Sequence, residues 1–216
     1  MKTIKRRGRA ATRTNDPERT KANIIQIATE EFAEVGYSGA RIDRIADKMN
    51  TSKRMIYYYF GSKEELYRAV LFEHYRRLRA NDRGAALQEK SPMEALATLT
   101  RLTFDWYVDH ASEVPLVMVE NTHRGKHISS LPEFESLNST AIELVRSIYE
   151  SGVAAGVMRP GLRPIDIYIT IASASFFNVS NRYTFKAIFG HDMSLKDEIE
   201  RRREALTDTV LRYVAA

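Results

Sequence analysis

The chain contains no cysteine, which excludes a disulfide framework, a thiolate metal site, a cysteine nucleophile and an iron–sulfur cluster. No apolar run approaches the roughly 18 residues that a membrane-spanning helix needs, and no apolar segment follows the basic N-terminus, as a secretory signal would require. The sequence has no Ser-His-Asp order, phosphate-binding loop or dinucleotide fingerprint, and its five histidines are scattered. We therefore expect a cytoplasmic protein that is not an enzyme and holds no cofactor.

Glycine and proline are scarce, with 10 and 6 residues among 216, and strictly alternating strand patterns are rare. With 44% apolar residues the chain can bury a core, which excludes a wholly disordered protein, and its length allows one or two domains. Helix start signals recur along the chain instead. The sequence therefore predicts an all-α fold.

The formal net charge of +5 is unevenly distributed. Residues 1–63 contain 14 Lys and Arg against 7 Asp and Glu, a net charge of +7, whereas residues 64–216 carry a net charge of −2. Such an asymmetry indicates a polyanionic partner such as nucleic acid or anionic lipid. The alternative is a solubility bias or a flexible basic tail.

A first helix is predicted from Asp16, an N-cap acceptor that precedes Pro17 at the first helical position. Gly36 is expected to end this helix. The apolar residues between them have a helical spacing and predict one buried face, comprising Ile25, Ala28, Phe32 and Val35.

Two shorter helices are predicted over 41–49 and 52–60, joined by a tight turn as in a helix-turn-helix. Ala46 lies where the helices would cross, and Asn50 tolerates the positive φ that such a turn requires. The second helix has an inner face of Ile56, Tyr59 and Phe60 and an outer face of Lys53, Arg54, Tyr57 and Tyr58. Cations and phenol hydroxyls there suit phosphates and base edges in a major groove. The alternative is an ordinary three-helix unit with a solvated basic face.

The same segment resembles the DNA-binding signature of the TetR family of transcriptional regulators. The matching residues are Ile45-Ala46 and, after the turn, Thr51-Ser52-Lys53-Arg54-Met55-Ile56-Tyr57-Tyr58-Tyr59-Phe60-Gly61-Ser62-Lys63-Glu64-Glu65-Leu66. Before them, the family's first-helix pattern is matched by Ala28, Phe32, Gly36 and Tyr37. The resemblance covers roughly residues 17–70.

The resemblance implies a set of DNA contacts. It places Arg41, Ser52 and Lys63 near backbone phosphates, Lys53 and Arg54 at base edges, and Tyr57 on the phosphate backbone with Tyr58 beside it. Because a Lys or Arg side chain can bond both O6 and N7 of guanine, we expect at least one G·C pair in each half-site opposite Lys53 or Arg54.

Six further helices are predicted over 62–79, 91–109, 113–123, 133–155, 165–181 and 194–214. Capping-box patterns start two of them, at Ser62 and Ser91, and Ser194-x-x-Asp197 is expected to start the last. In the TetR family the last two helices form a four-helix bundle across a two-fold axis, so the resemblance implies a homodimer on a palindromic operator. The small residues 172–175 permit close helix approach. Alternatively, these two helices are only core of the monomer.

The resemblance also implies that the C-terminal domain binds a small-molecule effector that lowers DNA affinity. Residues 176–183 resemble regulators of aromatic and N-heterocycle catabolism, which implies a planar aromatic or N-heterocyclic ligand. The candidate contacts are polar or aromatic residues within apolar helices: Phe104, Trp106, Tyr107, Asn121, His123, Arg124, Phe177, Asn178, Asn181 and Arg182. The alternative for each of these residues is that it is a polar or aromatic group with a purely structural role.

Glu120, His123 and His127 have the spacing of a metal-binding helix face. Gly125 between the two histidines favours a helix end instead, so no metal site is expected.

The sequence therefore predicts three parts: a basic flexible tail over 1–16, a three-helix helix-turn-helix DNA-binding domain over 17–63, and a larger helical effector-binding and dimerisation domain over 64–216. The tail either lies in the flanking minor groove or adds only nonspecific attraction. The leading hypothesis is a nucleoid-associated, ligand-responsive repressor with no membrane partner. The alternative is an architectural or weakly specific DNA-binding dimer without an effector.

Overall fold

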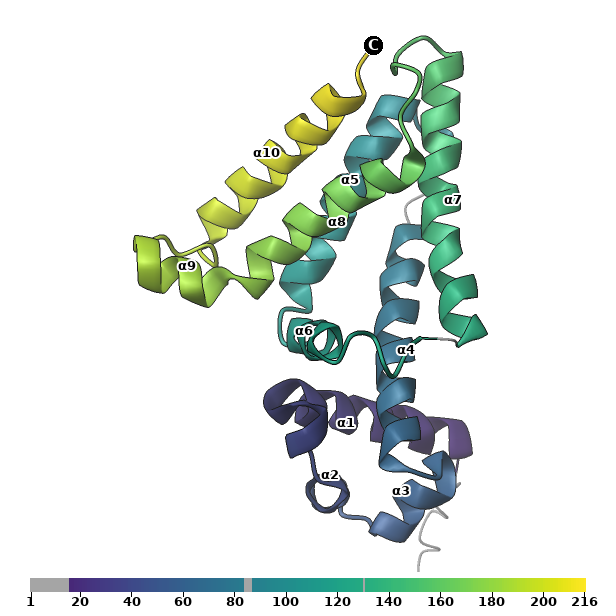
Figure 1. Ribbon diagram of the computed structural model, residues 1–216, viewed down its shortest axis with the longest axis vertical. Helices are drawn as coiled ribbons and strands as arrows, with labels where there is room; N and C mark the ends of the chain where they lie inside the picture. The colour runs from purple at the N-terminus through teal and green to yellow at the C-terminus, as the bar shows by residue number, and fades with distance from the viewer. Residues whose placement is uncertain (1–15, 84–86, 130) are drawn as a thin grey trace, which may run out of the picture.

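The computed structural model describes residues 16–83, 87–129 and 131–216 (Figure 1). These residues form α1 (Pro17–Gly39), α2 (Ile42–Lys48), α3 (Lys53–Phe60), α4 (Lys63–Arg83), a 3-10 helix η1 (Leu87–Glu89), α5 (Pro92–Asp109), α6 (Val114–Thr122), α7 (Pro132–Ala154), α8 (Pro164–Ser180), α9 (Arg182–Phe189) and α10 (Lys196–Val214). They contain no strand, and Met158 and Ala215 form an isolated β-bridge. The predicted all-α fold is confirmed. Apart from Asp16, the predicted basic tail lies outside the described residues.

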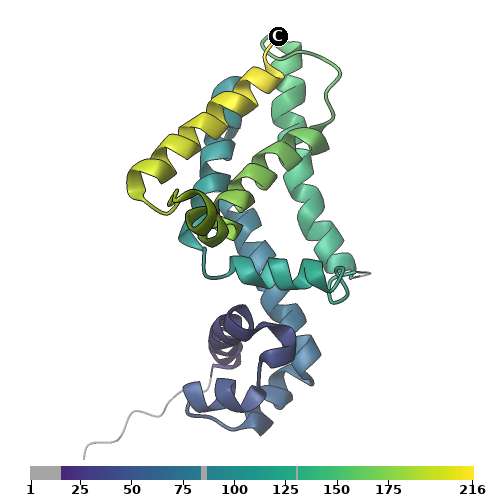
Figure 2. The same cartoon turned by 60° about the vertical axis from the view of Figure 1, so that its left-hand side comes forward.

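The head, which we define as residues 16–71, comprises α1, α2, α3 and the first half of α4 at the lower end of Figure 1. Its helices meet in one core, in which Phe32, Ile45, Ile56 and Leu66 are essentially inaccessible to solvent. Helix α4 then continues upward into the rest of the molecule in both views (Figures 1 and 2). Helix α4 therefore belongs both to the head and to the rest of the molecule.

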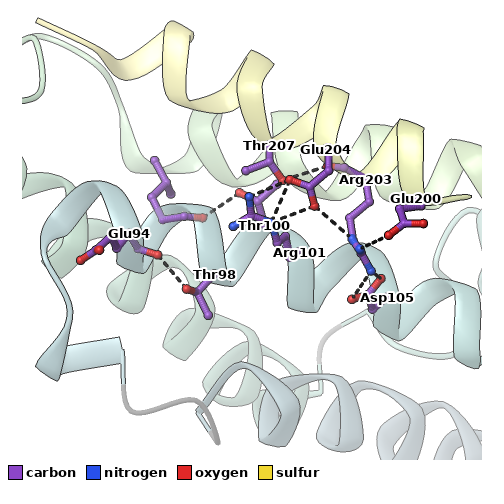
Figure 3. Close-up of polar contacts among 10 residues, drawn as sticks. Glu94, Thr98, Thr100, Arg101, Asp105, Glu200, Arg203, Glu204 and Thr207 are labelled. Atoms are coloured by element: carbon purple, nitrogen blue, oxygen red, sulfur yellow. Dashed lines mark hydrogen bonds and ion pairs between the residues drawn. The ribbon is translucent and has the colours of Figure 1, made fainter.

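The body, residues 87–216, is built mainly from α5, α7, α8 and α10 around a second core that includes Leu96, Val145, Ile171 and Val210. Ion pairs also hold α5 to α10: Arg101 bonds Glu204 at 2.7 Å, and Arg203 bonds Asp105 at 3.2 Å (Figure 3). Helix α6 lies crosswise at the lower end of the body, next to the head, in Figure 2.

Several predicted helix starts are confirmed. The Asp16 carboxylate accepts hydrogen bonds from the backbone N–H groups of Glu18 and Arg19, and Ser62 Oγ accepts one from Glu65 N–H. Glu94 closes a capping box by accepting from the backbone N–H of Ser91. Prolines at the first position also open α5, α7 and α8.

The predicted buried face of α1 is wrong at both ends: Ile24 is buried in place of Ile25, and Val35 is not buried. The buried stripe includes Ile24, Ala28 and Phe32, whereas Ile25 is only partly buried and Val35 is exposed. The physical reason is that Ile25 packs only against the edge of the head core and also lines a groove beside α4. Gly36 was expected to end this helix; with φ of 69° it instead kinks the chain, and α1 continues to Gly39.

The end of the chain also differs from the prediction. Helix α9 was not expected, because its eight residues carry no capping signal and none of its side chains is buried. Ser194 does not start the last helix. Its backbone N–H and hydroxyl both bond the Asp192 carboxylate, and Leu195 takes the N-cap position of α10.

Candidate nucleic-acid interface

A buried carboxylate holds α2 against α1. The Glu31 side chain is fully buried, and its Oε1 accepts a hydrogen bond from the backbone N–H of Arg41 at 3.4 Å. Its oxygens also form ion pairs with Nη1 of Arg44 at 3.5 Å and Nζ of Lys48 at 3.6 Å. Because a buried charge requires partners that offset its lost hydration, these contacts fix both ends of α2 relative to α1.

The turn between α2 and α3 has the geometry that its sequence predicts. Asn50 adopts φ of 51°, and the Thr51 backbone N–H bonds the carbonyl of Ala46, whose side chain is buried where the helices cross. Ser52 Oγ accepts a hydrogen bond from Met55 N–H at 3.3 Å and so caps α3. Gly61, with φ of 72°, ends α3 after eight residues.

Helix α3 has two chemically different faces. Ile56 is buried in the head core, with Tyr59 and Phe60 packed against its edge. The opposite face is open to solvent and presents Lys53, Arg54, Tyr57 and Tyr58, with Tyr58 79% exposed. Two cations and two phenol hydroxyls therefore project from the start and middle of one short helix.

An acidic side chain that sequence analysis did not single out lies beside these cations. Asp43, in the first turn of α2, contacts the Lys53 ammonium through Oδ1, and its Oδ2 lies 3.8 Å from Nη2 of Arg41. The spacing of ten residues between Asp43 and Lys53 follows no helical or strand repeat. Only the tertiary placement of α2 against α3 reveals the pair.

Lys63 differs from the other candidates because it is half-buried. Its ammonium lies 4.9 Å from the centroid of the Tyr37 ring, and desolvation lowers its pKa, partly offset by the Glu31 carboxylate. The seven candidates for DNA contact thus lie at the N-cap of α2, at the N-cap and along α3, and at the first residue of α4.

The ten candidates for effector contact do not converge on one cavity. Phe104, Trp106 and Tyr107 are buried in α5, and Asn178 is buried in α8 with its Oδ1 bonded to Nε of Arg202. The remaining side chains lie on the partly or fully exposed surface: Asn121, His123, Arg124, Phe177, Asn181 and Arg182.

The described residues form three hollows, and none of the ten candidates lines any of them. A groove of about 840 Å³ runs between α1 and α4, a hollow of about 440 Å³ lies beside Arg79 and α7, and one of about 630 Å³ covers residues 190–201. In the described structure, the Trp106 and Tyr107 rings instead pack closely with Leu78, Val114 and Val179.

Polar contacts hold helix α6 at both of its ends. At its start, Glu113 Oε2 lies 2.9 Å from Nδ1 of His74 and 2.5 Å from Nη2 of Arg77, both in α4. Burial by itself would raise the pKa of Glu113, but these two hydrogen bonds outweigh it and lower the pKa to about 2. The carboxylate is therefore held in its charged form at this joint.

At the other end of α6, the buried carboxylate of Glu120 bonds both the backbone N–H and Nδ1 of His127. Burial, reinforced by Glu120, also raises the pKa of Tyr67 in α4. The helix ends at Thr122, and Gly125 adopts φ of 69°, as expected for a helix end rather than a metal-binding face.

Within the described residues, no group of three or more His, Asp or Glu side chains is arranged to hold a metal ion. No helix of the described part has the length and apolar content to cross a bilayer.

Comparison with known proteins identifies the two halves of the chain. Residues 24–70 match the family model described as bacterial regulatory proteins, tetR family. Residues 92–210, more than half of the chain, match the model described as tetracyclin repressor-like, C-terminal domain.

Individual proteins of similar sequence point to the same family. The HTH-type transcriptional repressor NicS of Pseudomonas putida is 32% identical over 204 residues, which cover 94% of this chain and 96% of NicS. The HTH-type transcriptional repressor KstR2 of Mycolicibacterium smegmatis is 26% identical over 76% of this chain and 80% of its own.

Among solved structures, the Streptomyces coelicolor regulator SCO4942 has a TM-score of 0.69 at 25% identity and covers 90% of this chain and 98% of its own. The ketosteroid regulator KstR2 of Mycobacterium tuberculosis shares the fold, with a TM-score of 0.66 at 20% identity over 96% of this chain and all of its own. With matching family models over both halves and a relative aligned along nearly its whole length, the chain belongs to the TetR family of transcriptional regulators.

Proposed function

We propose that the protein is a repressor that binds a pseudo-palindromic DNA operator as a homodimer and leaves it when a small molecule binds the body. The observation that carries this proposal is the exposed face of α3, where Lys53, Arg54, Tyr57 and Tyr58 project from a capped helix. The N-terminal residues of a recognition helix are those that contact base edges. Two similar proteins are named repressors, NicS and KstR2.

Each of the seven candidate residues has a role in this proposal. Lys53 and Arg54 contact base edges, and Tyr57 and Tyr58 bond phosphate. The Ser52 hydroxyl accepts the capping bond from Met55, so its hydrogen is available to donate to a phosphate oxygen. Arg41 and Lys63 add positive charge at the starts of α2 and α4.

The proposed DNA-binding domain spans residues 17–63 and the proposed effector-binding and dimerisation domain spans 64–216. Helix α4 serves both, because Leu66 and Tyr67 pack in the head core while Leu78 packs with the body. Removal of residues 1–13 tests whether the tail over 1–16 takes part in DNA binding. If the tail lies in the minor groove, the DNA affinity of the shortened protein should depend less on salt concentration than that of the full chain. An unchanged salt dependence refutes this role.

We assign the dimer interface to α8 and α10. Ile165, Ile169, Ser173 and Phe177 are exposed and follow one another at intervals of four residues, so they form a continuous stripe along α8. An exposed apolar stripe of this kind is typical of a protein interface. A second copy of the chain, packing the same stripe against it across a two-fold axis, would remove it from water.

We assign the effector site to the body, around the aromatic residues of α5. The Trp106 ring lies 4.9 Å from that of His74, whose Nε2 is buried and has no hydrogen-bond partner among the described residues. Apolar walls with a few polar anchors suit a small planar ligand, aromatic or N-heterocyclic. His74 also bonds Glu113, so a ligand that moves this ring would disturb the start of α6.

DNA selection from a pool of random duplexes tests the DNA-binding half of this proposal. The wild-type protein is expected to enrich a palindromic motif, and Arg54→Ala to bind that duplex about 10- to 100-fold more weakly. Arg146→Ala is the matched control, because Arg146 is an exposed arginine of α7 whose ion pair with Glu143 is local. Equal effects of the two substitutions would contradict the proposal.

A thermal-shift screen over small aromatic acids, purines, pyrimidines and pyridines tests the effector half. A ligand that binds the native state raises the melting temperature, and it should also weaken operator binding by about 5- to 150-fold. A compound that stabilises the protein but leaves operator affinity unchanged would refute control by that compound.

The second candidate function is an architectural DNA-binding dimer without an effector. The observation that favours it is that none of the ten candidate effector residues lines a described hollow. It predicts uniform binding to unrelated duplexes in the selection experiment. Because both candidates act on the chromosome, both place the protein in the cytoplasm at the nucleoid.

A further inference from the structure

We infer that Lys53 and Asp43 act together as one reading unit for a single G·C base pair. This inference rests on the proposed binding of α3 to a DNA operator. Lys53 is the first residue of α3, and its ammonium is in contact with the Asp43 carboxylate of α2. The pair therefore presents a donor and an acceptor side by side from two different helices.

The chemistry of this pair is complementary to one edge of a G·C base pair. In the major groove, guanine offers the acceptors O6 and N7, and cytosine offers its N4 amino group as a donor. Guanine O6 and cytosine N4 are hydrogen-bonded to each other, at about 3 Å. A contacting ammonium and carboxylate have a comparable separation, so Lys53 can donate to guanine while Asp43 accepts from cytosine.

Both side chains have the hydrogen-bonding capacity that the double contact requires. The Lys53 ammonium has three donors, and one is used on Asp43, which leaves two for O6 and N7. The carboxylate has four lone-pair sites across its two oxygens, which can serve Lys53, Arg41 and the cytosine amino group. Neither group has to give up its partner in the pair when it meets the base pair.

The position of Asp43 excludes a simple role as a phosphate contact, because a carboxylate is repelled by the DNA backbone. Asp43 is 37% exposed and lies in the first turn of α2, where the helix dipole stabilises its negative charge. Arg41 lies on its other side at 3.8 Å and holds the second oxygen. A carboxylate held in this way is favourable opposite a hydrogen-bond donor, and the cytosine amino group beside guanine is such a donor in the major groove.

Lys53 and Arg54 are expected to contact DNA in different ways, because only Lys53 is paired with Asp43. Arg54 is exposed beside Lys53, so it can contact a neighbouring base or a phosphate independently of Asp43. At the base pair that Lys53 contacts, discrimination against other base pairs should depend on both Lys53 and Asp43. An A·T base pair offers an acceptor where the cytosine donor would be.

Selection from random duplexes with two single variants and their double variant tests this inference. Lys53→Ala and Asp43→Ala are each expected to relax the same G·C column of the motif, with a loss of discrimination there of about 10-fold or more. The double variant should lose no more at that column than either single variant, because the two groups act as one unit. Circular dichroism confirms that each variant is folded.

Asp47→Ala is the matched control, because Asp47 is another exposed carboxylate of α2 and its removal changes the head charge equally. It should leave the G·C column intact. The inference is overturned if Lys53→Ala weakens binding to all sequences equally, as loss of a phosphate contact would, or if the two substitutions relax different columns or none. If the wild-type protein enriches no motif at all, the proposed sequence-specific function is refuted and the inference falls with it.

Discussion

Replacing Glu113 by glutamine removes one negative charge from the joint between α4 and α6 and keeps the shape of the side chain. Glu113 accepts from His74 and Arg77, and its pKa lies at about 2 in the folded protein against an ordinary value of 4.5. Since one pKa unit equals about 1.4 kcal/mol, this difference corresponds to about 3 kcal/mol of stabilisation of the folded state.

The expected loss for Glu113→Gln is smaller than this, about 1–2 kcal/mol near pH 7. The glutamine carbonyl still accepts a neutral hydrogen bond, and Arg77 keeps an ion pair with Glu73 at 3.8 Å. The sign of the pH dependence follows from the lowered folded-state pKa. The contribution of Glu113 is complete above about pH 5 and is lost as the pH falls towards 2, so the difference between wild type and variant should shrink in that range.

Urea denaturation at several pH values between about 7 and 3, followed by tryptophan fluorescence, measures this difference directly. Trp106 is the single tryptophan and lies against His74, so its emission reports the same joint. Glu143→Gln is the control, because Glu143 is exposed and its ion pair with Arg146 should contribute less than about 0.5 kcal/mol. Equal unfolding free energies for wild type and Glu113→Gln near pH 7, or parallel pH profiles, would refute the reasoning.

Three further substitutions test other parts of the molecule. Asn50→Val should destabilise the head by about 1–2 kcal/mol in urea denaturation, because φ is 51° there, whereas Asn50→Gly should not; equal stabilities would contradict the strain argument. Tyr57→Phe should weaken DNA binding about 3- to 10-fold for all sequences alike by fluorescence anisotropy, and a sequence-dependent loss would instead indicate base contact. Ile169→Glu should give a monomer in sedimentation with unchanged circular dichroism, and a persisting dimer would exclude the α8 stripe.

The parts of the fold that were predictable from sequence depend on contacts near in the chain. Capping at Asp16, the positive φ of Asn50 and the two faces of α3 each follow from a few adjacent residues. The face of α1 was less predictable, because the choice between Ile24 and Ile25 depends on where α4 lies and not on the helical period.

The candidate interface shows the same division. Its cations are visible in the sequence because a known motif places them, whereas Asp43 and Glu31 acquire their roles only through helix packing. Glu31 looks like an ordinary surface acid of an amphipathic helix until α2 covers it and brings two cations to its oxygens. Long-range ion pairs follow no sequence repeat, so a single chain gives no signal for them.

The arrangement of α6 limits how an effector in the body can act on the head. Glu113, at the N-cap of α6, bonds Arg77 of α4, and Leu116 is buried in the head core. Val119 lies so close to Gly36 of α1 that a Cβ atom at Gly36 would be 3.6 Å from it. A ligand that displaces α6 must therefore move the head with it or break these contacts. A ligand shifts an equilibrium only by its differential affinity for the two states. The strength of these contacts therefore determines whether moving the head or breaking the contacts costs less free energy. Weakening them, as in Glu113→Gln, should reduce the effect of an effector on DNA affinity more than it reduces DNA affinity itself.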